Sequence, residues 1–161
     1  MAMAHHPLVL VVEDDTEMNL LERELLEQFG LDAVPAYSGA EALTRFEQSG
    51  ADAVLLDLML PEMDGYEVCA HLRHNGRPQV PIVVVTALDD EGSRRRAAEV
   101  GASAYFVKPF DCDAVGDAIR TLVAAEARAH PRNKDKPSCS TFLSCPTIRR
   151  GPGSSRGNPR R

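Results

Sequence analysis

The sequence predicts an α/β fold in which five helices cover an open, doubly wound sheet of five parallel strands. Two patterns indicate this class. First, short apolar runs rich in β-branched residues recur at 8–12, 33–37, 53–57, 81–86 and 104–107. Second, each run is followed by a segment with the 3.6-residue period of an amphipathic helix. Such alternation with short connections is typical of parallel strands joined by right-handed crossovers.

The composition of the runs separates central strands from edge strands. Residues 8–12, 53–57 and 81–86 are almost continuously Val, Leu and Ile, without polar alternation. Runs of this kind are typical of parallel strands that are covered on both faces. Residues 33–37 and 104–107 are shorter or more mixed. We therefore expect these two strands at the edges of the sheet.

The first two helical segments carry recognisable end signals. The apolar residues of the first fall on one stripe that we expect to face the core: Met18, Leu21, Leu25 and Phe29. Gly30 follows as a C-cap candidate. The second segment begins with residues 38–41, Ser-Gly-Ala-Glu, which is a capping-box pattern, and Gly50 lies just beyond its end.

The other three helices are expected at about 64–74, at about 89–100 and after residue 110. Gly76 and Gly101 follow the first two of these segments. In the last segment, apolar residues at helical spacing form one buried stripe: Val115, Ala118, Ile119, Leu122 and Val123.

Polar residues gather where the predicted strands end. In open parallel sheets the ligand site lies beyond the carboxyl ends of the strands. The acids 13–15 follow the first strand, and the next strand ends are marked by Asp57, Thr86 and Lys108. We expect the carboxylates of Asp14, Asp15 and Asp57 to meet a hydroxyl and an ammonium there. A single Asp at a strand end is most often a helix N-cap, so the joint pattern carries the argument.

These groups suit phosphoryl transfer. Three clustered acids raise each other's pKa unless a cation joins them. Oxygen ligands without thiol or imidazole favour Mg²⁺ or Mn²⁺. A carboxylate can attack phosphorus and form an aspartyl phosphate. Lys108 would offset the charge on the phosphoryl oxygens, and Thr86 would donate a hydrogen bond to one of them.

Four segments together resemble one known family. They are VVEDD at 11–15, LDLMLPEMDG at 56–65, VTA at 85–87 and VKPF at 107–110. Residues 7–129 resemble the receiver domain of bacterial two-component response regulators over essentially its full length. The resemblance implies a flavodoxin-like sheet with strand order 2-1-3-4-5.

The resemblance also implies roles for the acids. It makes Asp57 the phosphoacceptor. Asp14 and Asp15, with Asp57 and the backbone carbonyl of Met59, would hold Mg²⁺ or Mn²⁺. The chain would then catalyse only its own phosphorylation and slow dephosphorylation, so it is not expected to be an enzyme acting on other molecules.

The switch residues are implied in the same way. Lys108 matches the phosphate-sensing lysine, and its peptide bond to Pro109 is expected to be cis. Thr86 and Tyr105 match the hydroxyl and the aromatic residue that change position on phosphorylation. For Tyr105, an ordinary half-buried aromatic on an edge strand remains the alternative.

The implied partners are proteins. The phosphoryl donor would be a phosphohistidine on a sensor histidine kinase or on a histidine phosphotransfer protein. A downstream effector would bind the face formed by the fourth helix, the fifth strand and the fifth helix. No long apolar run or signal peptide is evident, so we expect a cytoplasmic protein without a membrane partner.

Charge divides the chain into parts. Residues 1–130 carry a net charge of −13, with 10 basic and 23 acidic residues, whereas residues 131–161 carry +7, with 8 and 1. We expect a leader at 1–6, the receiver domain at 7–129 and a basic tail at 130–161. More than half of residues 131–161 are Pro, Gly, Ser or Arg, so we expect disorder there.

Two other functions remain open. A DNA-binding transcriptional regulator would have its output domain missing here or replaced by the basic tail. We do not otherwise expect nucleic acid as a partner beyond nonspecific contact. A phosphatase with an aspartyl-phosphate intermediate ranks lower, because such enzymes usually carry a second Asp where this chain has Met59.

Overall fold

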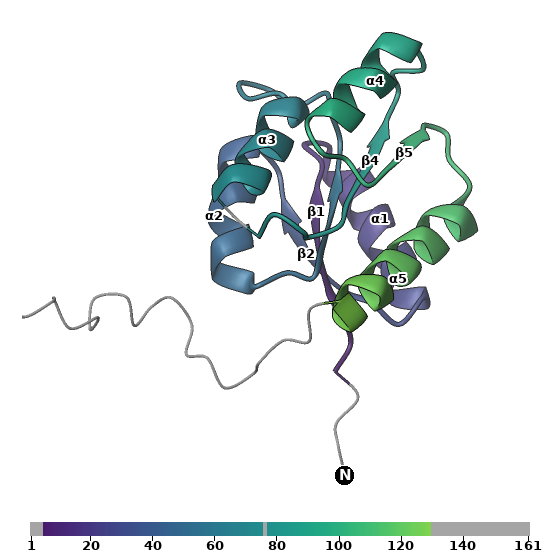
Figure 1. Ribbon diagram of the computed structural model, residues 1–161. Helices are drawn as coiled ribbons and strands as arrows, with labels where there is room; N and C mark the ends of the chain where they lie inside the picture. The colour runs from purple at the N-terminus through teal and green to yellow at the C-terminus, as the bar shows by residue number, and fades with distance from the viewer. Residues whose placement is uncertain (1–4, 76, 130–161) are drawn as a thin grey trace, which may run out of the picture. The chain divides into compact units, whose positions relative to one another are not determined.

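The computed structural model describes residues 5–75 and 77–129, in which strands and helices alternate (Figure 1). The elements are β1 (Leu8–Val12), α1 (Thr16–Gln28), β2 (Asp32–Ala36), α2 (Gly39–Ser49), β3 (Ala53–Leu56), α3 (Gly65–Asn75), β4 (Ile82–Thr86), α4 (Glu91–Glu99), β5 (Ala104–Val107) and α5 (Cys112–Ala129). Their bounds lie within one or two residues of the predicted ones. The expected tail, Gly76 and most of the leader lie outside the described residues, so the disorder of the tail stays a prediction.

All five strands are parallel, in the order β2-β1-β3-β4-β5. β2 and β5 lie at the edges, as their mixed composition predicts. The predicted flavodoxin-like sheet is therefore confirmed. None of the helices within residues 5–75 and 77–129 is long and apolar enough to cross a membrane.

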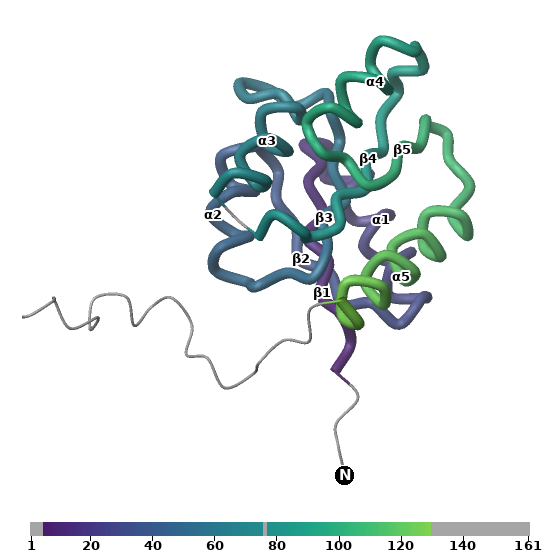
Figure 2. The backbone as a smooth tube through the Cα atoms, in the orientation of Figure 1, coloured from purple at the N-terminus to yellow at the C-terminus, as the bar shows by residue number. Residues whose placement is uncertain are grey.

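The central strands β1, β3 and β4 are buried on both faces, and the alternate side chains of β1 enter two separate cores. Leu10 and Val12 of β1 pack with α2 and α3, whereas Val9 and Val11 pack with α1 and α5. Figures 1 and 2 show the two pairs of helices on opposite sides of the sheet. Each fully buried Val or Leu side chain contributes about 1.5–3 kcal/mol. This double burial explains the continuous apolar runs.

Ser38 is the N-cap of α2, as predicted, and Glu41 completes a variant of the capping box by bonding the residue before the cap. The Glu41 N–H donates to Ser38 Oγ at 3.1 Å, and the Tyr37 N–H donates to the Glu41 carboxylate at 3.0 Å. Gly50 ends the helix with a φ of 66°. The two ends of α2 are thus fixed by the residues that signalled them in the sequence.

The predicted buried stripe of α1 is wrong at its centre. Leu21 is 58% exposed, and the fully buried residues of the helix are instead Asn19, Glu22 and Leu26. The other three predicted stripe residues are partly buried: Met18, Leu25 and Phe29. The helix is therefore rotated so that two polar side chains face the sheet.

Asn19 explains part of this rotation. Its side-chain amide donates to the backbone carbonyls of Val11, Glu13 and Ala36, at 3.2, 3.1 and 3.3 Å. These carbonyls lie at the ends of β1 and β2, where the strand ladder stops. A buried amide that satisfies such groups is stabilising, because unpaired buried carbonyls are unfavourable. Asn19 thus joins α1 to the end of the sheet that carries the candidate site.

Candidate functional site

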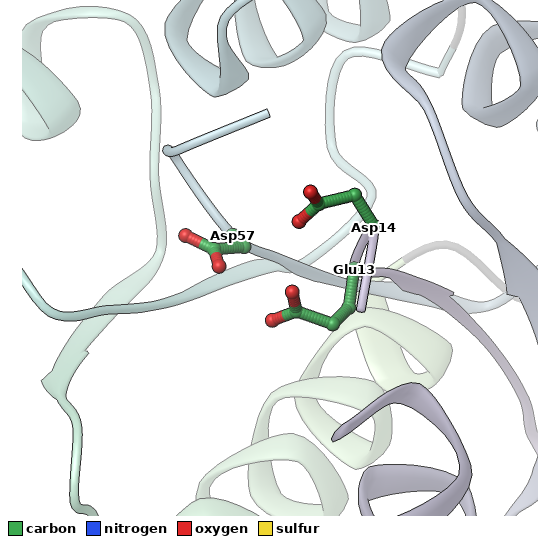
Figure 3. A group of neighbouring side chains, drawn as sticks. All are labelled: Glu13, Asp14 and Asp57. Atoms are coloured by element: carbon green, nitrogen blue, oxygen red, sulfur yellow. The ribbon is translucent and has the colours of Figure 1, made fainter. Parts of the chain in front are cut away.

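The carboxyl ends of β1 and β3 bring three acids together. Carboxylate oxygens of Glu13, Asp14 and Asp57 all lie within 4.8 Å of one another (Figure 3). Glu13 and Asp57 are 3% and 6% exposed, whereas Asp14 is open to solvent. The group therefore has two buried members and one that faces water.

Both carboxylate oxygens of Asp57 accept hydrogen bonds. Oδ1 accepts a hydrogen bond from the Met59 N–H at 2.9 Å, and Oδ2 accepts one from Lys108 Nζ at 3.0 Å. The Met59 side chain is 57% exposed beside it. Asp57 therefore presents a fixed carboxylate at the end of a buried strand, as predicted. The expected role of the Met59 carbonyl as a metal ligand stays a prediction.

The loop after Asp57 is packed tightly against the start of α3. A Cβ atom at Gly65 would lie 2.5 Å from the carbonyl oxygen of Asp57 and 2.5 Å from Cα of Leu58. The Gly65 N–H also donates to the Leu58 carbonyl at 3.0 Å. Only a residue without a side chain fits this approach. Gly65 thereby fixes the path of the backbone that carries Asp57.

Lys108 lies between the two buried acids. Its ammonium donates to Glu13 Oε2 and to Asp57 Oδ2. Burial lowers the pKa of Lys108, but the hydrogen bonds and negative charges of Glu13 and Asp57 outweigh it and raise the pKa above its usual value. Lys108 is therefore a fixed cation that offsets the repulsion between the acids. Its peptide bond to Pro109 is cis, as expected.

Glu13 is the acid that the sequence analysis did not select. Burial raises its pKa to about 7, the hydrogen bond from Lys108 opposes this, and the neighbouring Asp57 carboxyl adds to it. Its N–H still donates to the Ala36 carbonyl at 3.1 Å, so Glu13 continues the β1 ladder. The available signal was its place directly after four buried strand residues, which keeps its side chain inside.

Asp15, which was expected to bind metal, occupies a different position. Its carboxylate accepts hydrogen bonds from the N–H groups of Glu17 and Met18, at 2.9 and 3.1 Å. It is therefore the N-cap of α1, and it is not part of the group of three acids. The physical reason is that the first turn of a helix leaves N–H groups unpaired, and an Asp before it satisfies them.

Thr86 and Tyr105 both contact Leu88, which lies between β4 and α4. The fully buried Thr86 hydroxyl accepts a hydrogen bond from the Leu88 N–H at 3.4 Å. The Tyr105 hydroxyl donates to the Leu88 carbonyl at 2.8 Å. Thr86 also accepts, through its carbonyl, a hydrogen bond from the Lys108 N–H at 2.7 Å. One short segment thus connects the two hydroxyl residues predicted to form the switch.

The donor set fits a hard divalent cation. Glu13, Asp14 and Asp57 offer only carboxylate oxygens, which suit Mg²⁺ or Mn²⁺. The exposed Asp14 leaves one side of the group open to water, which Mg²⁺ retains in most protein sites. The residues therefore fit the expected cation, with Glu13 in the position that was expected for Asp15.

Comparison with known proteins agrees with this geometry. The family described as "Response regulator receiver domain" matches residues 9–120. The sensory transduction protein RegX3 of Mycolicibacterium smegmatis is 42% identical over 115 residues, covering 71% of this chain and 50% of that protein. The Bacillus subtilis alkaline phosphatase synthesis transcriptional regulatory protein PhoP is 35% identical over 128 residues, covering 80% and 53%.

Solved structures resemble the same part of the chain. The BeF₃-activated receiver domain of Klebsiella pneumoniae RstA is 34% identical, with a TM-score of 0.68, and the match covers 72% of this chain and 97% of that one. The chain spans about half the length of the curated relatives that it matches. The family match covers most of the chain, and the chain belongs to the response regulator receiver domain family.

Proposed function

We propose that Asp57 accepts a phosphoryl group from a phosphohistidine on a sensor histidine kinase or a histidine phosphotransfer protein. One observation carries the proposal: both oxygens of the buried Asp57 carboxylate are held, one of them by Lys108. In the reaction, one Asp57 oxygen bonds to phosphorus. The phosphorus–nitrogen bond breaks, and its electron pair stays on the imidazole of the donor.

Each neighbouring residue has a role in this transfer. Lys108 lies within hydrogen-bonding distance of Asp57 and offsets the charge of the arriving phosphoryl oxygens. The Thr86 hydroxyl donates a hydrogen bond to one of them once it turns away from Leu88. Mg²⁺ held by Glu13, Asp14 and Asp57 would supply further neutralisation of phosphoryl charge. The chain acts on its own aspartate and not on a free substrate.

The contacts of Leu88 support a mechanism for the switch. When Thr86 turns toward the phosphoryl group, the hydrogen bond from the Leu88 N–H is lost. The carbonyl of the same residue accepts the hydrogen bond from Tyr105, so a movement of Leu88 that breaks this second bond would release Tyr105 to move inward. The face formed by α4, β5 and α5 would change with it and alter the binding of an effector protein.

A transcriptional output is the second candidate function. The PhoP relative is named as a transcriptional regulatory protein, and this chain covers 53% of it. The receiver would then act through a DNA-binding partner or segment. DNA binding measured with and without residues 131–161 tests whether the basic tail has that role. A cytoplasmic location is part of the same proposal, because the phosphoryl donors envisaged here act there.

Labelling with acetyl phosphate and Mg²⁺ tests the phosphoacceptor. We expect Asp57→Asn to abolish labelling, because an amide is a poor nucleophile. Asp32→Asn is a matched control, since Asp32 is exposed at the start of β2, at the other end of the sheet. Labelling of Asp57→Asn at the wild-type level would contradict the assignment. Rapid release of free phosphate without a stable phosphoprotein would favour the phosphatase alternative.

A further inference from the structure

Glu22 is a buried acid that the proposed transfer does not use. It lies on α1 and is 2% exposed. Within residues 5–75 and 77–129, neither of its carboxylate oxygens has a hydrogen-bond partner. An ionised carboxylate in such a position is strongly unfavourable, so the neutral acid is preferred. Burial raises the pKa of Glu22 to about 8, although the positive charge of Lys108 acts in the opposite direction.

Glu22 lies close to the charged groups of the site. Glu22 and Lys108 line one groove, which is bounded by α1, the segment after β5 and the start of α5. Lys108, Glu13 and Asp57 act electrostatically on Glu22. The other titratable groups that line the groove are Glu24, Cys112 and Asp113. Lys108 is the positively charged residue among those that line this groove.

Among the described contacts, one donor hydrogen of the Lys108 ammonium has no acceptor. An ammonium group has three donor hydrogens, and the described contacts use one on Glu13 and one on Asp57. Glu22 makes no hydrogen bond to this ammonium, so the third hydrogen can reach Glu22 only if the ammonium moves toward α1. A neutral Glu22 has little attraction for the ammonium, whereas a carboxylate at the same place attracts it more strongly than in water, because Glu22 is buried.

We propose that Glu22 is a positioning residue for Lys108, which leaves the ammonium on Asp57 while Glu22 is protonated and competes for it when Glu22 is ionised. The inference rests on the proposed function of Asp57. Its consequence is that transfer to Asp57 slows in alkaline solution, because Lys108 is then drawn away from the phosphoryl oxygens. Glu22 itself touches none of the reacting atoms.

The pH profile of labelling tests this role. At saturating acetyl phosphate and Mg²⁺, we expect the initial rate for the wild type to fall about tenfold between about pH 7 and pH 9. Glu22→Gln keeps the shape but cannot ionise, so its rate should change less than about twofold. Glu22→Met should behave in the same way, and the exposed Glu24→Gln should keep the wild-type profile. Parallel profiles for the wild type and both Glu22 variants would overturn the proposal.

A second measurement separates this inference from the proposed function. The side-chain carboxyl carbon of Glu22, followed by NMR, should titrate with a midpoint near pH 8. In Lys108→Met the midpoint should rise, because the cation that favours the ionised form is gone. An unchanged midpoint, or one near the ordinary value of 4.5, would overturn the pairing. A wild type that is never labelled would refute the proposed function, while this titration would still decide whether Glu22 and Lys108 interact.

Discussion

Replacing Glu22 by Met should stabilise the protein. The pKa of Glu22 is raised from 4.5 to about 8 by burial. At neutral pH the unfolded chain carries an ionised Glu22, while the folded chain must keep it protonated. Because pH 7 lies about 2.5 units above the ordinary pKa of 4.5, keeping this proton in the folded state costs about 3 kcal/mol. Met has a similar length and no polar atom to bury, so most of this destabilisation should disappear, since exchanging a buried polar group for an apolar one of the same shape is tolerated.

The effect should depend on pH in a defined direction. Below about pH 4.5, Glu22 is protonated in both states, so its ionisation does not affect stability. Between about 4.5 and 8 the unfolded state binds fewer protons than the folded state, so the free energy of unfolding falls as the pH rises. The fall approaches about 1.4 kcal/mol per pH unit and ends above about pH 8. The advantage of Glu22→Met should therefore be smallest in acid and largest near pH 8.

Urea unfolding at several pH values measures this directly. Glu13, whose pKa is also raised, contributes in the same direction to both proteins, so the difference between them isolates Glu22. The control is Glu24→Met, which changes an exposed residue of the same helix and should have little effect at any pH. A pH-independent difference between Glu22→Met and the wild type, or a less stable variant, would refute the reasoning.

Three further predictions concern the site and its loops. Gly65→Ala should destabilise the protein by about 1–3 kcal/mol and reduce labelling, because its Cβ would lie 2.5 Å from the backbone of the acceptor loop. Urea unfolding measures the first effect and acetyl phosphate labelling the second. Asp15→Ala should weaken the start of α1 by about 1 kcal/mol with little change in Mg²⁺ affinity, whereas Asp14→Ala should lower that affinity, measured by titration. We expect the phosphoryl group on the wild type to last for many minutes, because neither the Met59 nor the Leu88 side chain can orient an attacking water. The double variant Met59→Asn with Leu88→Glu should shorten this lifetime, which is measured by the rate of phosphate release.

The fold was predictable because several local signals agree with one topology. The apolar runs of the central strands reflect burial on two faces, and the mixed runs mark the edges. Helix ends such as Ser38, Glu41 and Gly50 use side chains and backbone freedom that act over three or four residues. Signals of this range are visible in a single sequence. The sheet order, by contrast, came from the family resemblance and was not a product of these patterns.

The orientation of α1 was not predictable from periodicity. A hydrophobic stripe assumes that polar residues face solvent, but Asn19 and Glu22 are both buried. Asn19 is accounted for by carbonyl groups that are distant in the sequence, including Ala36. The electrostatic surroundings of Glu22 likewise depend on Lys108, which follows the edge strand β5 and is distant in the sequence. Contacts of this kind exist only after the sheet has formed, so they leave no mark on local spacing.

The sequence analysis selected Asp15 for the acid group, whereas the structure places Glu13 there, and the cause is similar. Both acids follow β1, and charge alone does not separate them. Asp15 lies before Thr16-Glu17-Met18, where its short side chain reaches the first free N–H groups of α1. Glu13 directly follows β1, its N–H still pairs with the Ala36 carbonyl, and its longer side chain reaches Lys108. Backbone conformation, which changes between these two residues, therefore assigns their roles.

The attachment of α4 indicates how a small change at Asp57 can alter a distant face. Among the described residues of α4, only Ala97 is fully buried, so the helix has little apolar contact with the sheet. Two arginines of α4 stack instead on aromatic rings, Arg94 at 5.0 Å from the centre of Tyr105 and Arg96 at 4.0 Å from that of Tyr66. Cation–π contacts at exposed sites contribute about 0.5–1 kcal/mol each.

The energies of the contacts that hold α4 are similar to the coupling free energy between two sites in a protein. Coupling between two sites in a protein is typically about 1–3 kcal/mol. The two ring contacts and the hydrogen bond from Tyr105 to Leu88 together fall in that range, whereas the buried core of β4 far exceeds it. Phosphorylation of Asp57, as proposed above, would therefore be able to rearrange α4 and Tyr105 without disturbing the sheet. We infer that the position of Tyr105, held at one side by Leu88 and at the other by Arg94, is where the charge at Asp57 is converted into a change of surface.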